Sequence, residues 1–226
     1  MKYHFAKPAA LFVILLVMSA QGCGRSQGSQ QSTNQGGGAQ TFQDAQTAAT
    51  QALATFRKLV NAQNYRELGF DSPDEAGSAT LGEPIKVLIV RLDQLSGYQP
   101  GSDPSRLLSD ANQVFYPVNA RERVRSSITV EQVDGKWRAA SLGNAGLANQ
   151  ISEVRKGTPT STADVIVQVP ALGLYFIGRP DASNKLMLTS LATSTPYNLR
   201  AGATQPAEEV FAALVPFARS HNGLPM

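Results

Sequence analysis

Residues 124–142, VRSSITVEQVDGKWRAASL, decide the fold because they specify a β-hairpin together with its register. Apolar and polar side chains alternate from Val124 to Glu131, a period that is typical of a strand with one buried face. Asp134-Gly135 follows, and this dipeptide is favoured in two-residue type I′ hairpin turns. The turn fixes four facing pairs: Val133 with Lys136, Gln132 with Trp137, Glu131 with Arg138, and Val130 with Ala139.

The predicted register assigns each side chain of the hairpin to one face of the sheet. Paired residues share a face, so Trp137 joins Val130 and Ile128 on the inner side. Glu131 and Arg138 then form a cross-strand ion pair on the outer side. A slip of the register by one residue would turn the only tryptophan to water.

Helix and strand patterns precede the hairpin. Residues 41–64 place apolar side chains at helical spacing, which predicts an amphipathic helix with one core face. Residues 85–92 (IKVLIVRL) and 113–120 (QVFYPVNA) predict strands, and Pro117 places the second at an edge or a bulge. We therefore expect an α+β domain over residues 41–157, with the N-terminal helix packed on a curved antiparallel sheet. This arrangement looks loosely like the cystatin or nuclear-transport-factor fold, an analogy that implies nothing about function.

A second group of elements follows the hairpin. Residues 147–154 predict a short helix, and the polar connector at 158–162 (TPTST) is the best candidate for an internal boundary. Beyond it, three short runs predict strands: residues 165–169, 174–177 and 185–190. Pro206 then begins a helix that Pro216 should kink or end. Residues 158–226 thus form a smaller β-rich lobe closed by a helix, or they extend the preceding sheet.

The N-terminal segment has the organisation of a secretory signal. Lys2, His4 and Lys7 form a basic start, and residues 9–20 (AALFVILLVMSA) form an apolar run. This run is shorter than the roughly 20 residues that a membrane-spanning helix needs. Residues 24–40 (GRSQGSQQSTNQGGGAQ) contain no apolar residue larger than Ala. We expect that stretch to be a disordered tether.

Two interpretations of the end of the signal remain open. Ala20 and Gly22 fit an ordinary cleavage site, with a small residue at both selected positions. That site would yield a soluble exported protein with an odd thiol. The same segment, Ala20-Gln21-Gly22-Cys23, resembles the lipobox of bacterial lipoproteins. Cys23 is also the only cysteine in the chain.

The resemblance to bacterial lipoproteins implies a modification and a location. Residues 1–22 would be the signal peptide, and Cys23 would receive a thioether-linked diacylglycerol and often a further acyl chain such as palmitate. Two or more acyl chains anchor a protein firmly to a lipid bilayer, with residues 23–40 as the lipidated tether. Gly24 is not the Asp that often retains such proteins at the inner membrane. In a cell with two membranes, the resemblance therefore implies the outer membrane of the cell envelope, facing the periplasm.

Composition restricts the chemistry of the rest of the chain. Removing residues 1–22 leaves 18 basic and 17 acidic residues, a balance that predicts no nucleic-acid partner. His221 and Cys23 are then the only histidine and cysteine, too few for a zinc site. Residues 71–75 (DSPDE) lack the spacing of a calcium loop and predict a capped turn. The sequence has no phosphate-binding loop after a predicted strand, so we assign no cofactor, metal or catalytic residue and favour a non-catalytic protein.

Alternating arginines at the start of the hairpin are the candidate partner-binding residues. If the strand begins early enough, Arg121, Arg123 and Arg125 all point outward with Arg138 nearby. Such a patch could bind an anionic partner, namely a phospholipid headgroup, a glycan or an acidic protein. It could equally be a solvated face whose charges discourage edge pairing.

Three functions fit these features. The first is a membrane-anchored envelope lipoprotein that presents a non-catalytic interaction domain. The second is a small-ligand binder with a pocket between helix and sheet, which Tyr116 and Trp137 could line unless they are ordinary core residues. The third is a hydrolase of unrecognised type. A deep, partly polar pocket would favour the second function, clustered carboxylates with raised pKa the third, and a flat apolar patch the first.

Overall fold

An amphipathic helix, α1 (Gly37–Leu59), opens the folded part in the computed structural model, which describes residues 37–156 and 163–221. Its core face matches the predicted helical spacing, with buried side chains at Ala45, Ala49, Ala52, Leu53 and Phe56. The helix begins at Gly37, so residues 37–40 are helical and do not belong to the tether. It ends before residue 64 because the side-chain amides of Asn61 and Asn64 donate to the Leu59 carbonyl at 3.1 and 2.9 Å.

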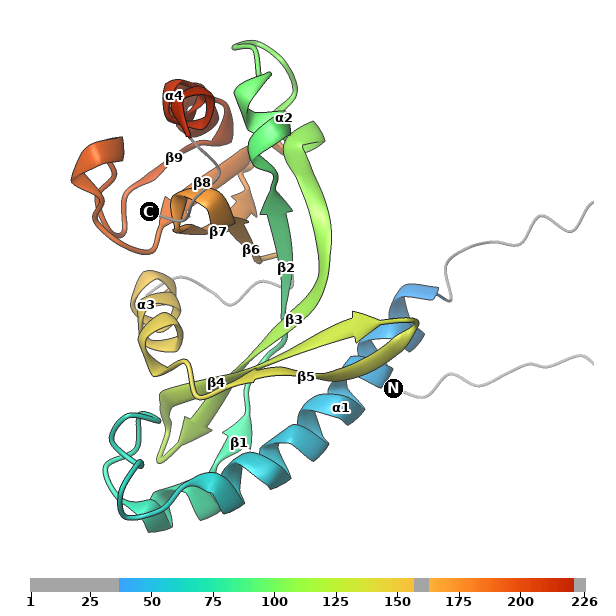
Figure 1. The fold of residues 1–226 in the computed structure, drawn as a ribbon, viewed down its shortest axis with the longest axis vertical. Helices are drawn as coiled ribbons and strands as arrows, with labels where there is room; N and C mark the ends of the chain where they lie inside the picture. The colour runs from blue at the N-terminus through green and yellow to red at the C-terminus, as the bar shows by residue number, and fades with distance from the viewer. Residues whose placement is uncertain (1–36, 157–162, 222–226) are drawn as a thin grey trace, which may run out of the picture. The chain divides into compact units, whose positions relative to one another are not determined.

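The described residues form one nine-stranded sheet in the order β5-β4-β3-β2-β6-β7-β8-β9, with β1 paired to β3 outside this path (Figure 1). The strands are β1 (Thr80–Leu81), β2 (Ile85–Val90), β3 (Leu108–Ala120), β4 (Arg123–Val133), β5 (Lys136–Leu142), β6 (Val165–Val169), β7 (Leu174–Pro180), β8 (Leu186–Ser190) and β9 (Thr204–Pro206). The predicted strands are therefore all present.

Strands β1 to β5 pair antiparallel, as predicted for residues 41–157, and the complete sheet is mixed. The parallel pair is β2 with β6, in which Val87 lies opposite Ile166. Between β5 and β6 the chain forms α3 (Ala145–Arg155), and a parallel pair requires a crossover connection of this kind. Strands β6 to β9 extend the sheet of the preceding part. The α+β fold with an N-terminal helix on a sheet is present as predicted.

The central hairpin has the predicted register. All four facing pairs occur: Val133 with Lys136, Gln132 with Trp137, Glu131 with Arg138, and Val130 with Ala139. Asp134 and Gly135 have φ values of 49° and 75°, as a type I′ turn requires. Arg138 donates to Glu131 Oε1 at 2.9 Å on the outer side, and the half-buried Trp137 packs against the core under α1.

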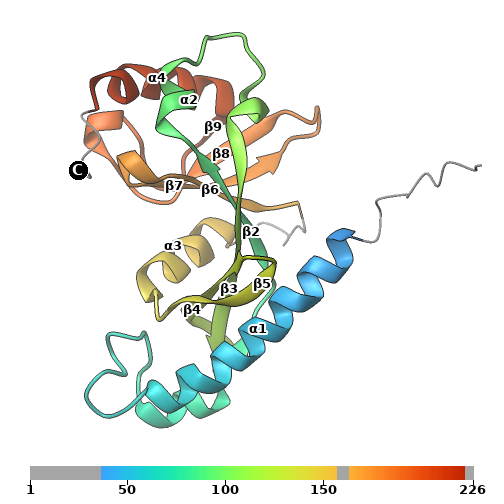
Figure 2. The same ribbon diagram turned by 45° about the vertical axis from the view of Figure 1, so that its right-hand side comes forward.

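Helices cover both faces of the sheet. Alternation along β3 turns Tyr116 towards α1 and its neighbour Phe115 towards α3. On the C-terminal strands, Ile166 faces α3, whereas Val167 faces α4 (Ala207–Ser220). Since paired residues share a face, α1 and α4 lie on the same face and α3 lies on the other. Figure 2 shows α1 along β4 and β5 at one end, with α4 and the short α2 (Leu92–Ser96) at the other.

Prolines begin the short 3-10 helices among the described residues. These helices are η1 (Pro73–Ser78), η2 (Pro104–Leu107), η3 (Pro170–Leu172) and η4 (Thr195–Tyr197), and each has proline in its first two positions. A proline there is tolerated because that N–H has no intrahelical partner. In η2, Asp103 is the N-cap, and its side chain accepts the N–H of Ser105.

The sequence predicted that Pro216 would kink or end the last helix. Helix α4 continues past Pro216 to Ser220, so the proline does not end it. Pro216 is exposed, and the carbonyl that it deprives of a partner can be hydrated on that side. His221 follows as the C-cap, the position at which a histidine complements the last carbonyls.

Candidate functional site

The arginines predicted to form one outward patch are separated in the structure. Arg121 lies in the β3–β4 turn with a φ of 48°, and Arg123 is exposed beside it. Arg125 is instead buried, with only 9% of its surface exposed. The expectation that all three point outward is wrong because η1 and the residues before it cover this part of β4.

Arg125 is held by two carboxylates from the covering segment. Its Nε donates to Glu75 Oε1 at 2.8 Å, and its Nη2 donates to Asp71 Oδ2. Arg123 also reaches Asp71, at 3.3 Å. Glu75 is 1% exposed, and its Oε2 accepts the N–H of Asp71 at 2.7 Å. Asp71 and Glu75 therefore neutralise arginines. The turn predicted at residues 71–75 is present as η1, but its N-cap Ser72 makes no side-chain capping hydrogen bond.

Arg138 does not lie near the other three arginines. It faces Glu131, which stands eight residues beyond Arg123 on β4. At about 3.3 Å per residue, that is about 26 Å along the strand. The four arginines therefore do not form one anion-binding surface, and three of them already have an acidic partner.

The space between α1 and the sheet is filled by side chains. Phe56 and Phe70 pack there with ring centres 5.8 Å apart, and Tyr116 is fully buried between helix and sheet. Burial raises the pKa of Tyr116 to about 12. Tyr116 and Trp137 belong to this core, which confirms the core interpretation of both residues and leaves no support for a pocket there.

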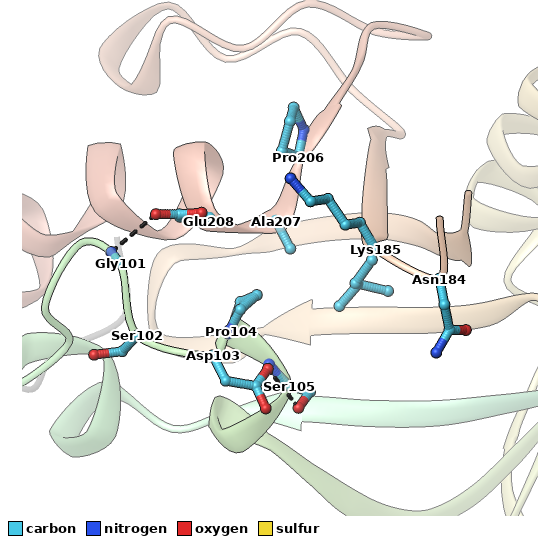
Figure 3. A pocket seen from close by; sticks show the side chains of 11 residues that line it. Gly101, Ser102, Asp103, Pro104, Ser105, Asn184, Lys185, Pro206, Ala207 and Glu208 are labelled. Carbon is cyan, nitrogen blue, oxygen red and sulfur yellow. Dashed lines mark hydrogen bonds between the residues drawn. The ribbon is translucent and has the colours of Figure 1, made fainter. Parts of the chain in front are cut away.

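A polar cleft of about 550 Å³ lies at the other end of the same sheet face. Its walls come from residues 101–105, from the β7–β8 turn and from the start of α4. Figure 3 shows Lys185 extending towards Pro206, with Asp103 and Ser105 on the facing wall and Glu208 beside Gly101. Three distant segments of the sequence thus contribute charged groups to one recess.

Local hydrogen bonds fix the acidic walls of the cleft. Asp103 Oδ1 accepts from the N–H and the hydroxyl of Ser105, at 2.9 and 2.7 Å. These bonds hold the pKa of Asp103 below its usual value. Glu208, in the first turn of α4, accepts the N–H of Gly101 at 2.8 Å, which ties this loop to the helix. Burial, assisted by the charges of Glu208 and Asp103, raises the pKa of the neighbouring Tyr98.

Lys185 supplies the positive charge of the cleft. Its backbone N–H donates to Asp181 Oδ1 at 2.9 Å, which fixes the turn that presents it. Its side chain is exposed, and among the described residues no acid forms an ion pair with it. The cleft therefore offers an ammonium and two carboxylates, a set that can bind a ligand with groups of both charges.

Sequence reasoning missed this cleft because each residue also has a local role. Asp103 caps η2, Lys185 lies in the β7–β8 turn, and Glu208 complements a helix dipole. Only tertiary packing unites them: the bond between Gly101 and Glu208 spans 107 positions. No spacing in the sequence could have signalled that contact.

The membrane and metal predictions can be compared only with the described residues. Within residues 37–156 and 163–221, no helix is both long and apolar enough to cross a bilayer. The same residues contain no cluster of three or more His, Cys, Asp or Glu side chains suited to a metal ion. The predicted signal peptide, Cys23 and most of the tether lie outside the described residues.

Comparison of the chain with protein-family models, with curated proteins and with solved structures gives no match in any of the three.

Proposed function

We propose that the chain is a lipid-anchored cell-envelope protein that presents a non-catalytic binding domain. The lipobox-like segment that ends at Cys23, the only cysteine, supports the anchor. A tether over residues 24–36, before α1, would hold the domain away from the headgroups. In a cell with two membranes, we place the protein on the outer one, facing the periplasm.

The polar cleft around Lys185, Asp103 and Glu208 is the observation that carries the binding function. We propose that it takes a ligand with both a cationic and an anionic group, since it offers one ammonium and two carboxylates. Asp103 has a lowered pKa and stays ionised at neutral pH, which suits binding a cation better than donating a proton. This arrangement supports the small-ligand alternative, but at this cleft and not at the interface between α1 and the sheet.

The binding proposal is tested by native mass spectrometry of the full chain extracted in mild detergent. The wild-type protein should retain a bound species that Lys185→Glu does not, because reversing the charge repels the anionic group. Lys58→Glu, on the exposed side of α1, is the matched control and should retain it. Retention by all three proteins, or by none, would contradict the proposed cleft.

The intact mass of the same detergent-extracted protein tests the lipid anchor separately. We expect a polypeptide that begins at Cys23 and carries the added mass of a diacylglycerol and an acyl chain. A chain that begins at Cys23 without added mass would show that the ordinary signal peptide is the correct interpretation.

A further inference from the structure

A second cleft, of about 410 Å³, lies on the opposite face of the sheet, where α3 meets β7, β8 and β9. Cross-strand pairing places its lining residues on one face: Arg179 lies opposite Met187, and Thr189 lies opposite both Ile177 and Thr204. The last turn of α3 closes the cleft with Val154 and Arg155. It is therefore built from rigid elements.

Two arginines in this cleft share a single buried carboxylate. Arg179 donates to both oxygens of Asp164, at 2.6 and 2.8 Å, and this hydrogen bonding raises the pKa of Arg179. Arg155 Nε lies 3.1 Å from Asp164 Oδ2, but not in hydrogen-bond geometry. The side chain of Asp164 is only 1% exposed. The buried cluster thus has two positive charges and one negative charge.

The guanidinium of Arg155 has N–H donors that an anion in the cleft can use. Its side chain is only 14% exposed, and within the described part of the chain its contact with Asp164 is an electrostatic one alone. A guanidinium presents five N–H donors in a planar fork that matches a carboxylate. Thr189 and Thr204 add hydroxyls that lie 2.8 Å apart. An anion in the cleft would meet these donors directly.

The rest of the lining selects among anions. Asp181 also borders the cleft, but it is exposed, and its Oδ1 already accepts the N–H groups of Ser183 and Lys185. The charges of Arg155, Arg179 and Asp164 sum to +1, so a singly charged anion balances them better than a phosphate dianion does. Val154, Ile177 and Met187 supply apolar walls beside the guanidinium.

From these contacts we infer that the cleft beneath α3 binds a small aliphatic carboxylate, with Arg155 as its principal partner and Met187 against its hydrocarbon part. This site is separate from the cleft around Lys185 and does not depend on the function proposed for that cleft.

The test is an NMR titration of the full chain in detergent, labelled with ¹⁵N-arginine, with sodium butyrate as the probe. The Arg155 resonance should shift saturably with a Kd in the millimolar range, the affinity expected of a ligand with about six heavy atoms. Inorganic phosphate is the competing probe. Tighter binding of phosphate than of butyrate would overturn the assignment to a carboxylate.

Variants locate the binding site. Arg155→Gln should weaken butyrate at least about tenfold. Asp164 keeps its Arg179 partner in that variant, so the fold should persist. Arg138→Gln, the same change in an exposed ion pair on β5, should leave the titration unchanged. Equal binding by the wild-type protein and by Arg155→Gln would overturn the inference.

A second substitution tests the same cleft even if Arg155→Gln does not fold. Met187→Trp leaves every charge in place and fills the cleft from β8. The Arg179 resonance then reports whether butyrate enters. Loss of the saturable shift supports the site, whereas a butyrate response unchanged from the wild-type protein overturns it.

Discussion

The two ends of one sheet face differ in whether their charged side chains are neutralised by neighbouring side chains or face a cleft. Beneath α1, small alanines let the helix lie close to β4 and β5, and the nearby arginines are neutralised by acids. Beside α2 and α4, aromatic residues pack edge to face, as Tyr98 does with Phe211 at 6.2 Å between ring centres. Lys185, Asp103 and Glu208 stand at the border of that second core with their charges facing a cleft. Under the proposed function, the α1 end serves stability, whereas the charges that would bind a ligand lie towards the C-terminal strands.

The largest effect should come from removing the buried arginine at the α1 end. Arg125→Met leaves Glu75 buried without its partner, and breaking such a pair costs about 3–5 kcal/mol of unfolding free energy. Arg123→Met removes an exposed charge of the same type from the same strand and should cost less than about 1 kcal/mol. Urea denaturation of both variants measures the difference. Equal losses would show that the Arg125 network is not what stabilises this end.

A double substitution sharpens that result. Glu75→Leu combined with Arg125→Met removes both charges, so no unpaired ion remains in the core. We expect the double variant to be more stable than Arg125→Met alone. A simple sum of the two single losses would mean that the two side chains do not interact energetically.

The close approach of the covering segment to β4 should give the next largest effect. Gly69 has a φ of 94°, and a Cβ there would lie 1.9 Å from the Arg125 carbonyl oxygen. We expect Gly69→Ala to cost at least about 2 kcal/mol, because both the backbone and its neighbour must move. Gly77→Ala, where nothing lies within 4 Å of the added atom, should change stability by less than about 1 kcal/mol. Thermal unfolding of the two variants tests this, and similar losses would contradict the close packing of this segment.

Local chemistry made part of the fold predictable. The Asp134-Gly135 turn and the two-residue alternation were enough to predict the hairpin register and the ion pair between Glu131 and Arg138. The burial of Arg125 could not be predicted, because its partner Glu75 lies 50 positions earlier in the chain. An alternating pattern does not distinguish an arginine that stays exposed from one that a distant segment buries.

The same limit applies to the sheet and to the candidate site. The parallel pairing of β2 with β6 joins segments about eighty positions apart, and periodicity contains no information about such partners. Lys185 lies in the β7–β8 turn and Glu208 in α4, yet both line one cleft because β8 pairs with β9 and α4 follows directly. Sequence patterns therefore predicted most of the elements, though not β1, α2 or β9, whereas long-range packing determined which charges meet.

The smallest expected change is a gain in stability from the core under α1. Tyr116 is fully buried, and within the described residues its hydroxyl has no hydrogen-bond partner, so Tyr116→Phe should raise the unfolding free energy by about 1 kcal/mol. The folded chain holds the phenol proton up to a pKa of about 12, whereas an unfolded chain releases it near the ordinary value of 10. Stability should therefore fall between those pH values in the wild-type protein and fall less in Tyr116→Phe. Tyr175→Phe, at a site that is 38% exposed, is the matched control and should leave the unfolding free energy at pH 7 unchanged. If Tyr116→Phe instead lowers stability in urea titrations at pH 7, the hydroxyl contributes a favourable contact, and the α1 end is less completely closed to polar partners than its packing implies.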